Sequence, residues 1–318
     1  MYSFGIIMDP IEDINPKEDS TFSIITALQK NHNIEYIVPD TIHLINQDIF
    51  AQTKKLNTFK RKKDFYKLSR SRLMNLSKLD CILFRKDPPV DEKYIQTTHM
   101  LDYLEKNGVL IINSPQSLRD YNEKLLGNNL TKLNLPTLVS SNQETIVDFI
   151  KKHKKVVIKP LNLMGGKEIS LLSLQDKDLL KSIKAMSGNS RRFVMVQKYL
   201  KEIKDGDTRI LITNGIVHEN VLVRYPPKND FRANLSYGGK FEVRKINPKH
   251  LDHLKDIAIY LKNNRIYFAG VDMIGDYITE INITSPTGIQ QIELKDKSLS
   301  SVIANQFIKI VEQHYDDK

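Results

Sequence analysis

Three side chains near the carboxyl end of the chain, Asp272, Glu280 and Asn282, have the types and spacing of a metal site. Glu280 and Asn282 are two residues apart, so in a strand both project from one face while Ile281 points to the other. Asp272 lies in the apolar run that precedes them. Carboxylate and amide oxygens suit a hard ion such as Mg²⁺ better than they suit zinc or copper.

The turn between the apolar run with Asp272 and the strand with Glu280 and Asn282 decides whether the three side chains meet. Gly275-Asp276 is a turn signal between two predicted strands. A strict two-residue turn would put Asp272 out of phase with Glu280, whereas a three-residue loop or a β-bulge would bring them face to face. Two interpretations stay open at this point: a platform for Mg²⁺ and a nucleotide, or a hairpin with a solvated polar face.

Length and composition limit the class of protein. The chain has 318 residues, 40% of them hydrophobic, so we expect two domains and a substantial core. No apolar run approaches the length of a membrane span, and the first eight residues predict a buried strand rather than a signal peptide. The single cysteine, Cys81, excludes a disulfide framework and lies in an apolar run typical of a core thiol. These features predict a cytoplasmic protein.

The net charge of +10 is concentrated in one segment. Between Ala51 and Asp80 there are ten Lys and Arg opposed only by Asp64 and Asp80, so this segment carries +8 of the total. Such a segment could bind polyanions, nucleic acid included, or could be a solvated flap. We favour the flap, because the rest of the chain is nearly neutral.

The first third of the chain alternates strands and helices, which favours a small parallel sheet. The predicted strands are 4–8, 34–38, 81–84 and 109–112. The predicted helices are 20–30, capped by Ser20, and 91–106, followed by Gly108 as a stop signal.

An α+β module follows, and the last third is rich in strands. The module begins with a short helix capped by Asn122 and continues with strands 137–139, 155–160, 169–174 and 193–197 and helices 142–152 and 178–186. The last third contains a hairpin over 208–224 with a type I′ turn at Asn214-Gly215, a loop over 225–241, and helices over 250–262 and 299–314.

The sequence has neither of the common phosphate-binding motifs, G-x-x-x-x-G-K-[ST] and G-x-G-x-x-G, so a nucleotide site would have to be built in another way. Nothing marks a Ser/His/Asp triad either. Lys159 ends a predicted strand just before a turn with Gly165-Gly166, and Lys124 lies in the first turn of a helix. Lysines in such places can reach phosphate oxygens, and glycine lets backbone N–H groups approach them. A lone strand-end lysine is, however, usually a solvated terminus.

Other polar residues could complete a nucleotide site. The segment 197–200 leads out of a strand and could border an adenine ring, with Asp207 near the sugar hydroxyls. Arg209, Arg224 and Arg232 are spaced so that the hairpin and the following loop could converge on an anion. The planar guanidinium binds carboxylate or phosphate at two points, which suits it to this role.

The order of these residues along the chain resembles that of the ATP-grasp ligases. Longer segments are similar to the bacterial glutathione synthetases, namely Ile7–Pro10, Phe84–Pro89, Asn113–Asp120, Asn122–Leu125 and Glu280–Thr287. The resemblance spans nearly the whole chain, to about Glu293.

This resemblance implies an ATP-grasp fold of α/β and α+β type in three parts: an N-terminal parallel-sheet domain (1–121), a lid domain (122–202) and a C-terminal catalytic domain (203–318). It implies that ATP phosphorylates the carboxylate of γ-glutamylcysteine and that the amine of glycine then attacks, giving glutathione, ADP and phosphate. It also implies small-molecule partners without membrane or nucleic acid, and a homotetramer.

The resemblance further implies roles for individual residues. ATP would be held by Lys124, Lys159, Met164, Gly165, Gly166, Gln197, Lys198, Tyr199, Leu200 and Asp207. Mg²⁺, or Mn²⁺ in its place, would be held by Asp272, Glu280 and Asn282. The catalytic residues would be Arg209, Arg232 and Asn234. The substrates would be contacted by Arg85, Arg224, Gly238, Gly239, Ser285 and Thr287.

Some features depart from the family pattern, and two alternatives stay open. Pro226 and Pro227 stiffen one edge of the 225–241 loop, which is our candidate for the mobile lid loop. Lys167-Glu168 is more charged than is typical, and Gly288 stands where relatives can have cysteine.

The alternatives are another carboxylate–amine ligase on this scaffold, such as a glutamate or D-alanine ligase, and a basic nucleic-acid-binding protein.

Overall fold

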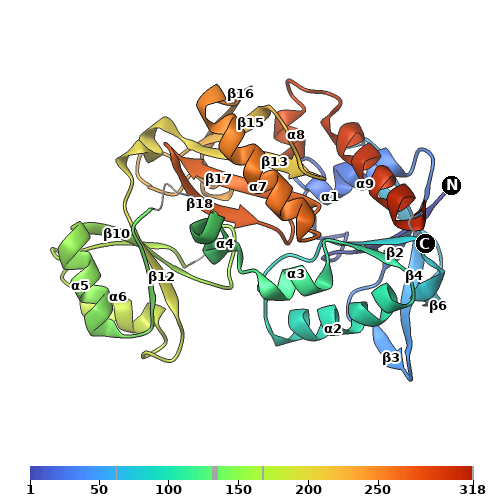
Figure 1. Cartoon of the computed structure of the whole chain (residues 1–318), viewed down its shortest axis with the longest axis horizontal. Helices are drawn as coiled ribbons and strands as arrows, with labels where there is room; N and C mark the ends of the chain where they lie inside the picture. The colour runs from blue at the N-terminus through green and yellow to red at the C-terminus, as the bar shows by residue number, and fades with distance from the viewer. Residues whose placement is uncertain (62, 131–134, 167, 317–318) are drawn as a thin grey trace.

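The computed structural model describes residues 1–61, 63–130, 135–166 and 168–316. Lys62 of the basic segment and Lys167 after the double glycine lie outside the described residues. The described strands form three sheets, which lie one after another along the long axis of the molecule (Figure 1). None of the described helices has both the length and the apolar character needed to cross a membrane.

The first sheet confirms the predicted parallel core. β1 (Ser3–Ile7) pairs in parallel with β2 (Asn33–Ile37) and β7 (Cys81–Phe84), and β7 pairs in parallel with β8 (Leu110–Ile112). The helices of this region are α1 (Ser20–Leu28), α2 (Glu92–Lys106) and α3 (Pro115–Asp120).

One predicted helix cap was wrong. The carboxylate of Asp19, not the hydroxyl of Ser20, accepts the hydrogen bond from the N–H of Phe22 at 2.7 Å, so Asp19 is the N-cap of α1. Ser20 is the first helical residue and is fully buried, and its hydroxyl accepts a hydrogen bond from the N–H of Ile289 at 3.1 Å. The caps at Asp91 and Asn142 lie where the sequence predicted these helices to begin.

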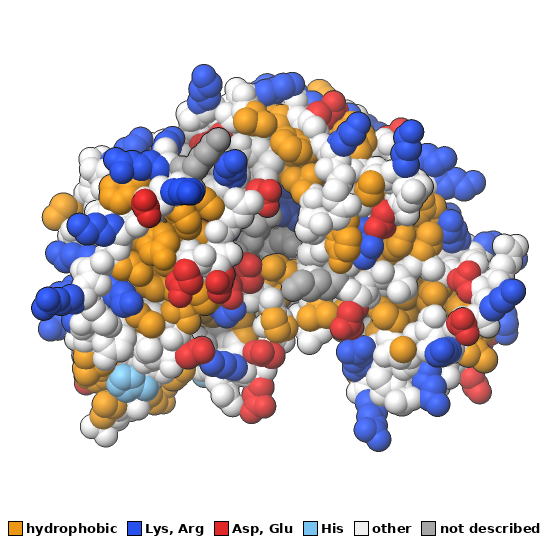
Figure 2. Space-filling model, turned by 180° about the vertical axis from the view of Figure 1, so that it is seen from behind, with side chains coloured by type: hydrophobic (Ala, Val, Ile, Leu, Met, Phe, Trp, Pro, Cys, Tyr) orange, Lys and Arg blue, Asp and Glu red, His pale blue; other side chains and the backbone are white. Residues whose placement is uncertain are grey.

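The basic segment is an antiparallel extension of the first sheet. β4 (Asp48–Thr58) pairs with β2, and β3 (His43–Ile45), β5 (Tyr66–Leu68) and β6 (Arg72–Asn75) pair with β4. In the first half of β4 the buried Ile49, Ala51 and Thr53 alternate with half-buried residues, and the alternation is interrupted at the exposed Lys55. Figure 2 shows Lys and Arg interspersed with Asp and Glu on one face of the whole molecule, so the basic side chains do not make one continuous patch there.

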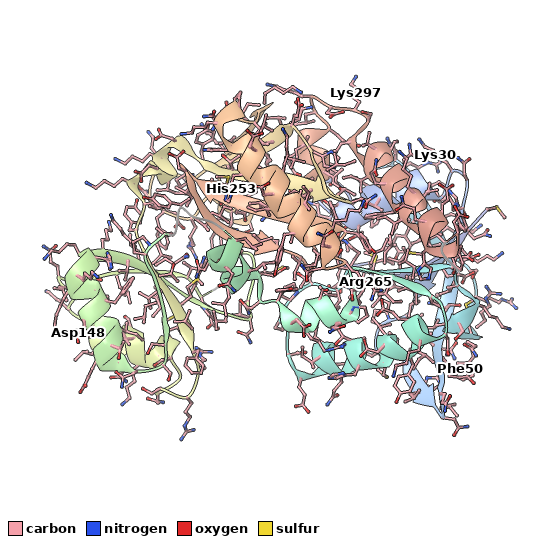
Figure 3. The ribbon with its side chains drawn as sticks, in the orientation of Figure 1. Lys30, Phe50, Asp148, His253, Arg265 and Lys297 are labelled. Atoms are coloured by element: carbon pink, nitrogen blue, oxygen red, sulfur yellow. The ribbon has the colours of Figure 1, made fainter. Side chains whose placement is uncertain are left out.

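The second sheet, which we call the lid sheet, is antiparallel in the order β11-β10-β12-β9. Its strands are β9 (Thr137–Ser140), β10 (Lys155–Pro160), β11 (Ser170–Ser173) and β12 (Val194–Lys198). The helices α5 (Gln143–His153) and α6 (Leu179–Met186) pack on one face, where Val156 and Ile158 join Ile146 in a core of their own. Asp148 on α5 and Phe50 on β4 mark opposite ends of the molecule (Figure 3).

The third sheet is antiparallel in the order β16-β15-β13-β17-β18, with β14 (Ile216–Val217) beside β13. Its strands are β13 (Asp207–Thr213), β15 (Asn220–Tyr225), β16 (Lys240–Lys245), β17 (Phe268–Ile274) and β18 (Tyr277–Asn282). Asn214 and Gly215 both have positive φ, as the predicted type I′ turn requires. The strand β16 was not predicted, and it begins within the segment predicted as a loop.

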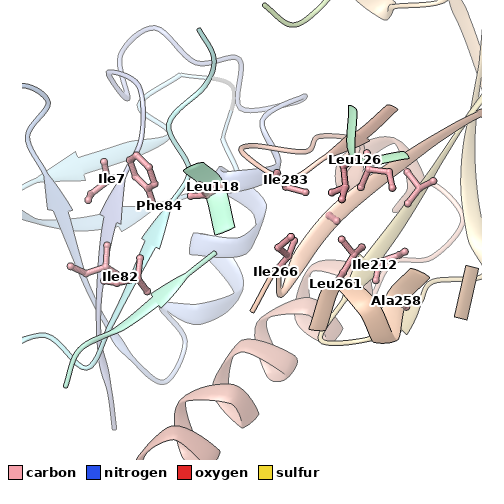
Figure 4. Packing of buried hydrophobic residues seen from close by; sticks show 14 of the residues in the cluster. Ile7, Ile82, Phe84, Leu118, Leu126, Ile212, Ala258, Leu261, Ile266 and Ile283 are labelled. Atoms are coloured by element: carbon pink, nitrogen blue, oxygen red, sulfur yellow. The ribbon is translucent and has the colours of Figure 1, made fainter. Parts of the chain in front are cut away.

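The first and third sheets share one hydrophobic core, which also includes Leu126 of α4 (Glu123–Leu130) (Figure 4). α4 packs directly against β18, where a side chain at Gly127 would lie only 3.0 Å from Ile278 Cγ2. The side-chain amide of Asn113 joins the two sheets further by donating to the carbonyls of Phe268 (2.8 Å) and Ile283 (2.6 Å). The remaining helices are α7 (Leu251–Asn263), α8 (Ile289–Ile292) and α9 (Leu299–Asp316).

Candidate active site

A cleft of about 260 Å³ lies between the lid sheet and the third sheet. The alternation of β10 explains how the lid contributes to the cleft: Val156 and Ile158 face the helices of the lid, so Val157 and Lys159 face the cleft. In Figure 2 the molecule is hollowed near its centre. The described residues that line the cleft include six Lys and Arg side chains and four carboxylates, an excess of two positive charges that attracts a polyanion.

The β17–β18 hairpin brings the three predicted metal ligands together. Asp272 is directly opposite Glu280, and Gly270 is opposite Asn282. The turn has two residues, and the register shifts between Asp272 and Met273, which is a β-bulge. A β-bulge is one of the two features that the sequence led us to expect if Asp272 and Glu280 were to lie face to face. The amide of Asn282 donates to Asp272 Oδ2 at 3.1 Å.

Two arginines hold the carboxylate of Asp272. Arg209 donates from Nε (2.5 Å) and Nη2 (2.7 Å), one bond to each carboxylate oxygen, and Arg224 Nη2 lies 3.1 Å from Oδ1. Burial raises the pKa of Asp272, but the two guanidinium groups outweigh burial and hold the pKa at about 2. Burial raises the pKa of Asp207 to about 6, although Arg224 Nη2 lies 2.6 Å from its Oδ2.

The two predicted phosphate-binding lysines lie close to Glu280. Lys124 Nζ is 3.2 Å from Glu280 Oε1 and donates to the carbonyl of Leu163 at 2.5 Å. Lys159 Nζ donates to the carbonyl of Thr279 at 3.3 Å. Burial lowers the pKa of Lys159, and the charge of Glu280 opposes that shift. Neither lysine is a solvated terminus, because both side chains are buried.

Two loops approach each other over the cleft. The hydroxyl of Tyr237 donates to the carbonyl of Gly166 at 3.3 Å, and its ring lies 3.6 Å from the guanidinium carbon of Arg232. Gly166 has a φ of +78°, and a Cβ there would lie 2.8 Å from Asn234 Oδ1. The loop around Gly166 therefore packs against the loop that carries Arg232 and Asn234.

Most of the predicted site residues line the cleft, and three do not. The residues brought together are Lys124, Lys159, Met164, Gly165, Gly166, Gln197, Lys198, Tyr199, Leu200, Asp207, Arg209, Arg224, Arg232, Asn234, Asp272, Glu280, Asn282, Ser285 and Thr287. Gly238 and Gly239 are not among the lining residues. Arg85 also lies outside the lining and is buried, and its guanidinium donates to the carbonyl of Pro286 at 2.9 Å.

Two groups of lining residues were not predicted from the sequence. The first group, which we call the apolar slot, consists of four aliphatic side chains that could pack against a flat ring. They are Val157, Ile169, Ile203 and Ile274. The alternation of β10 could have identified Val157, whereas the other three depend on how the sheets are placed. The second is Glu123, whose Oε1 accepts hydrogen bonds from the N–H groups of Ile283 (2.7 Å) and Thr284 (2.8 Å).

Solved structures of ATP-grasp enzymes share this fold. A D-cycloserine synthetase aligns over 97% of this chain and 99% of its own length, with a TM-score of 0.66 and 12% identity. The ATP-grasp ligase PsnB, in complex with a precursor variant, Mg and ADP, aligns over 97% of this chain and 98% of its own, with a TM-score of 0.59 and 17% identity. These structures show the fold, and together with the model of an ATP-grasp domain that matches residues 123–297 they define an ATP-dependent ligase of the ATP-grasp class.

The sequence of this chain matches one particular family within the ATP-grasp class. The N-terminal domain of prokaryotic glutathione synthetase matches residues 2–119, and the ATP-grasp domain of the same enzyme matches residues 123–297. A glutathione synthetase from Coxiella burnetii is 38% identical over 312 residues, which cover 98% of this chain and 96% of that protein. This chain belongs to the prokaryotic glutathione synthetase family, which confirms the resemblance seen in its sequence.

Proposed function

We propose that this enzyme joins γ-glutamylcysteine to glycine with the hydrolysis of one ATP, giving glutathione, ADP and phosphate. The observation that carries this proposal is the cluster of buried Lys124, Lys159 and Arg209 around the paired carboxylates of Asp272 and Glu280. Such a cluster positions and neutralises transferring phosphate without a protein nucleophile. Family membership supplies the identity of the substrates.

ATP would lie between the lid sheet and the third sheet. Lys124 and Lys159 would contact its phosphates, and the loop Met164–Gly166 would cover them. The adenine ring would enter the apolar slot beside Gln197–Leu200, with the ribose at Asp207. These placements are supported by the lining of the cleft and by the preference of phosphates for lysine and for glycine N–H groups.

The ligands fit a hard divalent ion, which we propose to be Mg²⁺, or Mn²⁺ in its place. Asp272, Glu280 and Asn282 offer only oxygen, and Asp272 is ionised at neutral pH. Among the described residues, no group of three or more His, Cys, Asp or Glu could hold a metal, so phosphate oxygens and water would complete the shell. The ion would neutralise charge on the transferring phosphate.

The reaction would proceed through an acyl phosphate. A carboxylate oxygen of the dipeptide attacks the γ-phosphorus of ATP, the bond to the bridging oxygen breaks, and ADP leaves. The amine of glycine then attacks the acyl carbon and loses a proton as the C–N bond forms and the C–O bond to phosphate breaks. Arg209, Arg232 and Asn234 would stabilise charge in these steps, while Arg224, Ser285 and Thr287 would contact the dipeptide.

An isotope experiment tests this route. γ-Glutamylcysteine labelled with ¹⁸O in its cysteinyl carboxylate should transfer one labelled oxygen to phosphate in each turnover, because the C–O bond that breaks carries that oxygen. The isotope content of the released phosphate is measured by mass spectrometry. Unlabelled phosphate formed together with glutathione would rule out the acyl phosphate.

The glycine loop provides a matched pair of variants. Gly166→Ala should raise the KM for ATP at least about tenfold, because a left-handed backbone costs an alanine about 1–2 kcal/mol and its Cβ would meet Asn234 Oδ1 at 2.8 Å. Gly165→Ala should raise the KM less, because φ is again positive but, apart from its chain neighbours, no described residue has an atom within 4 Å of the added Cβ. Steady-state kinetics with varied ATP measure both. A larger effect at Gly165 would contradict the proposed loop contact.

We also propose a cytoplasmic homotetramer built from domains 1–121, 122–202 and 203–318. The proposal of an oligomer is supported by β3, an edge strand whose Leu44 and Ile45 are exposed, and by the exposed Leu73 on β6, which pairs with the other side of β4. Light scattering after gel filtration should give four times the 36.8 kDa chain mass. A monomer at micromolar concentration would rule this assembly out.

A further inference from the structure

The segment that follows β18, residues 283–287, is held from both sides by buried charged side chains. On one side, Glu123 Oε1 accepts three hydrogen bonds: from the N–H of Ile283 (2.7 Å) and from the N–H and the hydroxyl of Thr284 (2.8 Å each). Glu123 is only 7% exposed, so these bonds are shielded from water. A carboxylate that accepts three such bonds fixes the backbone at the start of the segment.

On the other side, arginines bind the carbonyl groups of the same segment. Arg85 donates to the carbonyls of Thr284 (3.4 Å) and Pro286 (2.9 Å), and also to the hydroxyl of Thr21 at 3.1 Å. Arg209 Nη1 donates to the carbonyl of Thr287 at 3.2 Å. The N–H groups at the start of the segment thus point to Glu123, and the carbonyls of Thr284, Pro286 and Thr287 point to the two arginines.

The segment held in this way carries side chains that line the cleft. Ser285 and Thr287 lie in the lining together with Asn282 and Asp272. The hydroxyl of Ser285 lowers the pKa of Asp87 against the effect of burial, so it lies near this carboxyl group of the N-terminal sheet region. The nucleotide-binding lysine next to Glu123 along the chain, Lys124, contacts Glu280 and the carbonyl of Leu163 instead. The contacts of Glu123 and Arg85 with residues 283–287 are therefore separate from those around the nucleotide, whereas Arg209 takes part in both.

We propose that Glu123 and Arg85 are positioning residues that fix residues 283–287 and thereby set the affinity for the dipeptide, not for ATP. This inference rests on the proposed function. It gives Arg85 a role other than direct substrate contact, because a guanidinium occupied by Thr21 and by two carbonyls, outside the cleft lining, acts on the substrate only through the segment it holds.

A pair of substitutions at Thr284 tests the proposal. Thr284→Val removes the hydroxyl donor to Glu123 and keeps the shape of the side chain, whereas Thr284→Ser keeps the hydroxyl. Thr284→Val should raise the KM for γ-glutamylcysteine about tenfold, the value of one hydrogen bond to a charged group, and leave the KM for ATP within about twofold. Thr284→Ser should restore the wild-type KM. Glu123→Gln should also raise the KM for γ-glutamylcysteine, and by more than Thr284→Val does.

The outcomes separate this inference from the proposed function. Wild-type enzyme that makes no glutathione would refute the function itself. If the wild type is active, a Thr284→Val enzyme with equal changes in both KM values, or with a lower melting temperature and unchanged KM values, would overturn the positioning role. If Glu123→Gln fails to fold, the two Thr284 variants still test the positioning role. Both keep the hydrogen bonds from the backbone N–H groups of Ile283 and Thr284 to Glu123.

Discussion

Replacing Glu280 with glutamine is expected to lower kcat/KM at least about 100-fold and to leave the fold intact. A bound metal contributes several kcal/mol to the stabilisation of charge in the transition state, and each 1.36 kcal/mol corresponds to about a factor of ten in rate. Glutamine keeps the shape of the side chain and an acceptor for Lys124, which lies 3.2 Å away, but removes the negative charge. Turnover is measured over a titration of Mg²⁺, with circular dichroism as the check on folding.

The matched control is Glu219→Gln, because Glu219 is exposed and pairs with Lys245 at the surface, away from the cleft lining. It should turn over like the wild type. Normal turnover by the Glu280→Gln enzyme would contradict the metal assignment. The nucleic-acid hypothesis makes the opposite prediction, because it expects RNA affinity that falls steeply with salt and is unchanged by Glu280→Gln.

Asp272→Asn is expected to lower the free energy of unfolding by about 3–5 kcal/mol, the usual effect of removing one partner from a buried ion pair. Asp272 is 4% exposed and is bound by both Arg209 and Arg224. Its replacement leaves Arg209 without its carboxylate in a buried place, whereas Arg224 keeps Asp207. The same change removes a proposed metal ligand, so turnover should be lost as well.

Denaturant unfolding monitored by fluorescence or circular dichroism measures this loss of stability. Asp252→Asn is the control, because Asp252 is exposed on α7 and should tolerate the change. The double variant Arg209→Met/Asp272→Asn should recover part of the stability, because it removes the unpaired buried charge, and should recover no activity. An Asp272→Asn protein as stable as the wild type would show that the arginines do not depend on this carboxylate.

Local patterns were enough to predict the hairpin that carries Asp272 and Glu280. The two-residue periodicity of a strand fixed which side chains share a face, and the turn signal at Gly275 limited the possible registers to a few. The N-terminal parallel sheet could be predicted for a similar reason, since apolar runs such as Cys81–Phe84 alternate with capped helices. The matching strands agree within one or two residues.

Other features could not be predicted because they depend on non-local contacts. The ion pair of Arg209 with Asp272 arises from the pairing of β13 with β17, 63 positions apart, which no local pattern shows. Arg85 was expected at the substrate because its segment is similar to family sequences, yet the carbonyls that it binds belong to Thr284 and Pro286, about 200 positions further on. The strand β4 was missed because the consecutive Lys54 and Lys55 interrupt its alternation of buried residues.

The most direct test of the central claim is the release of phosphate from Mg-ATP with γ-glutamylcysteine and glycine, with each component omitted in turn. We expect one phosphate for each glutathione formed, and no sustained release when the dipeptide is left out. Sustained release that needs neither substrate, or no release beside tight binding of RNA, would contradict the assignment of this cleft to the synthesis of glutathione.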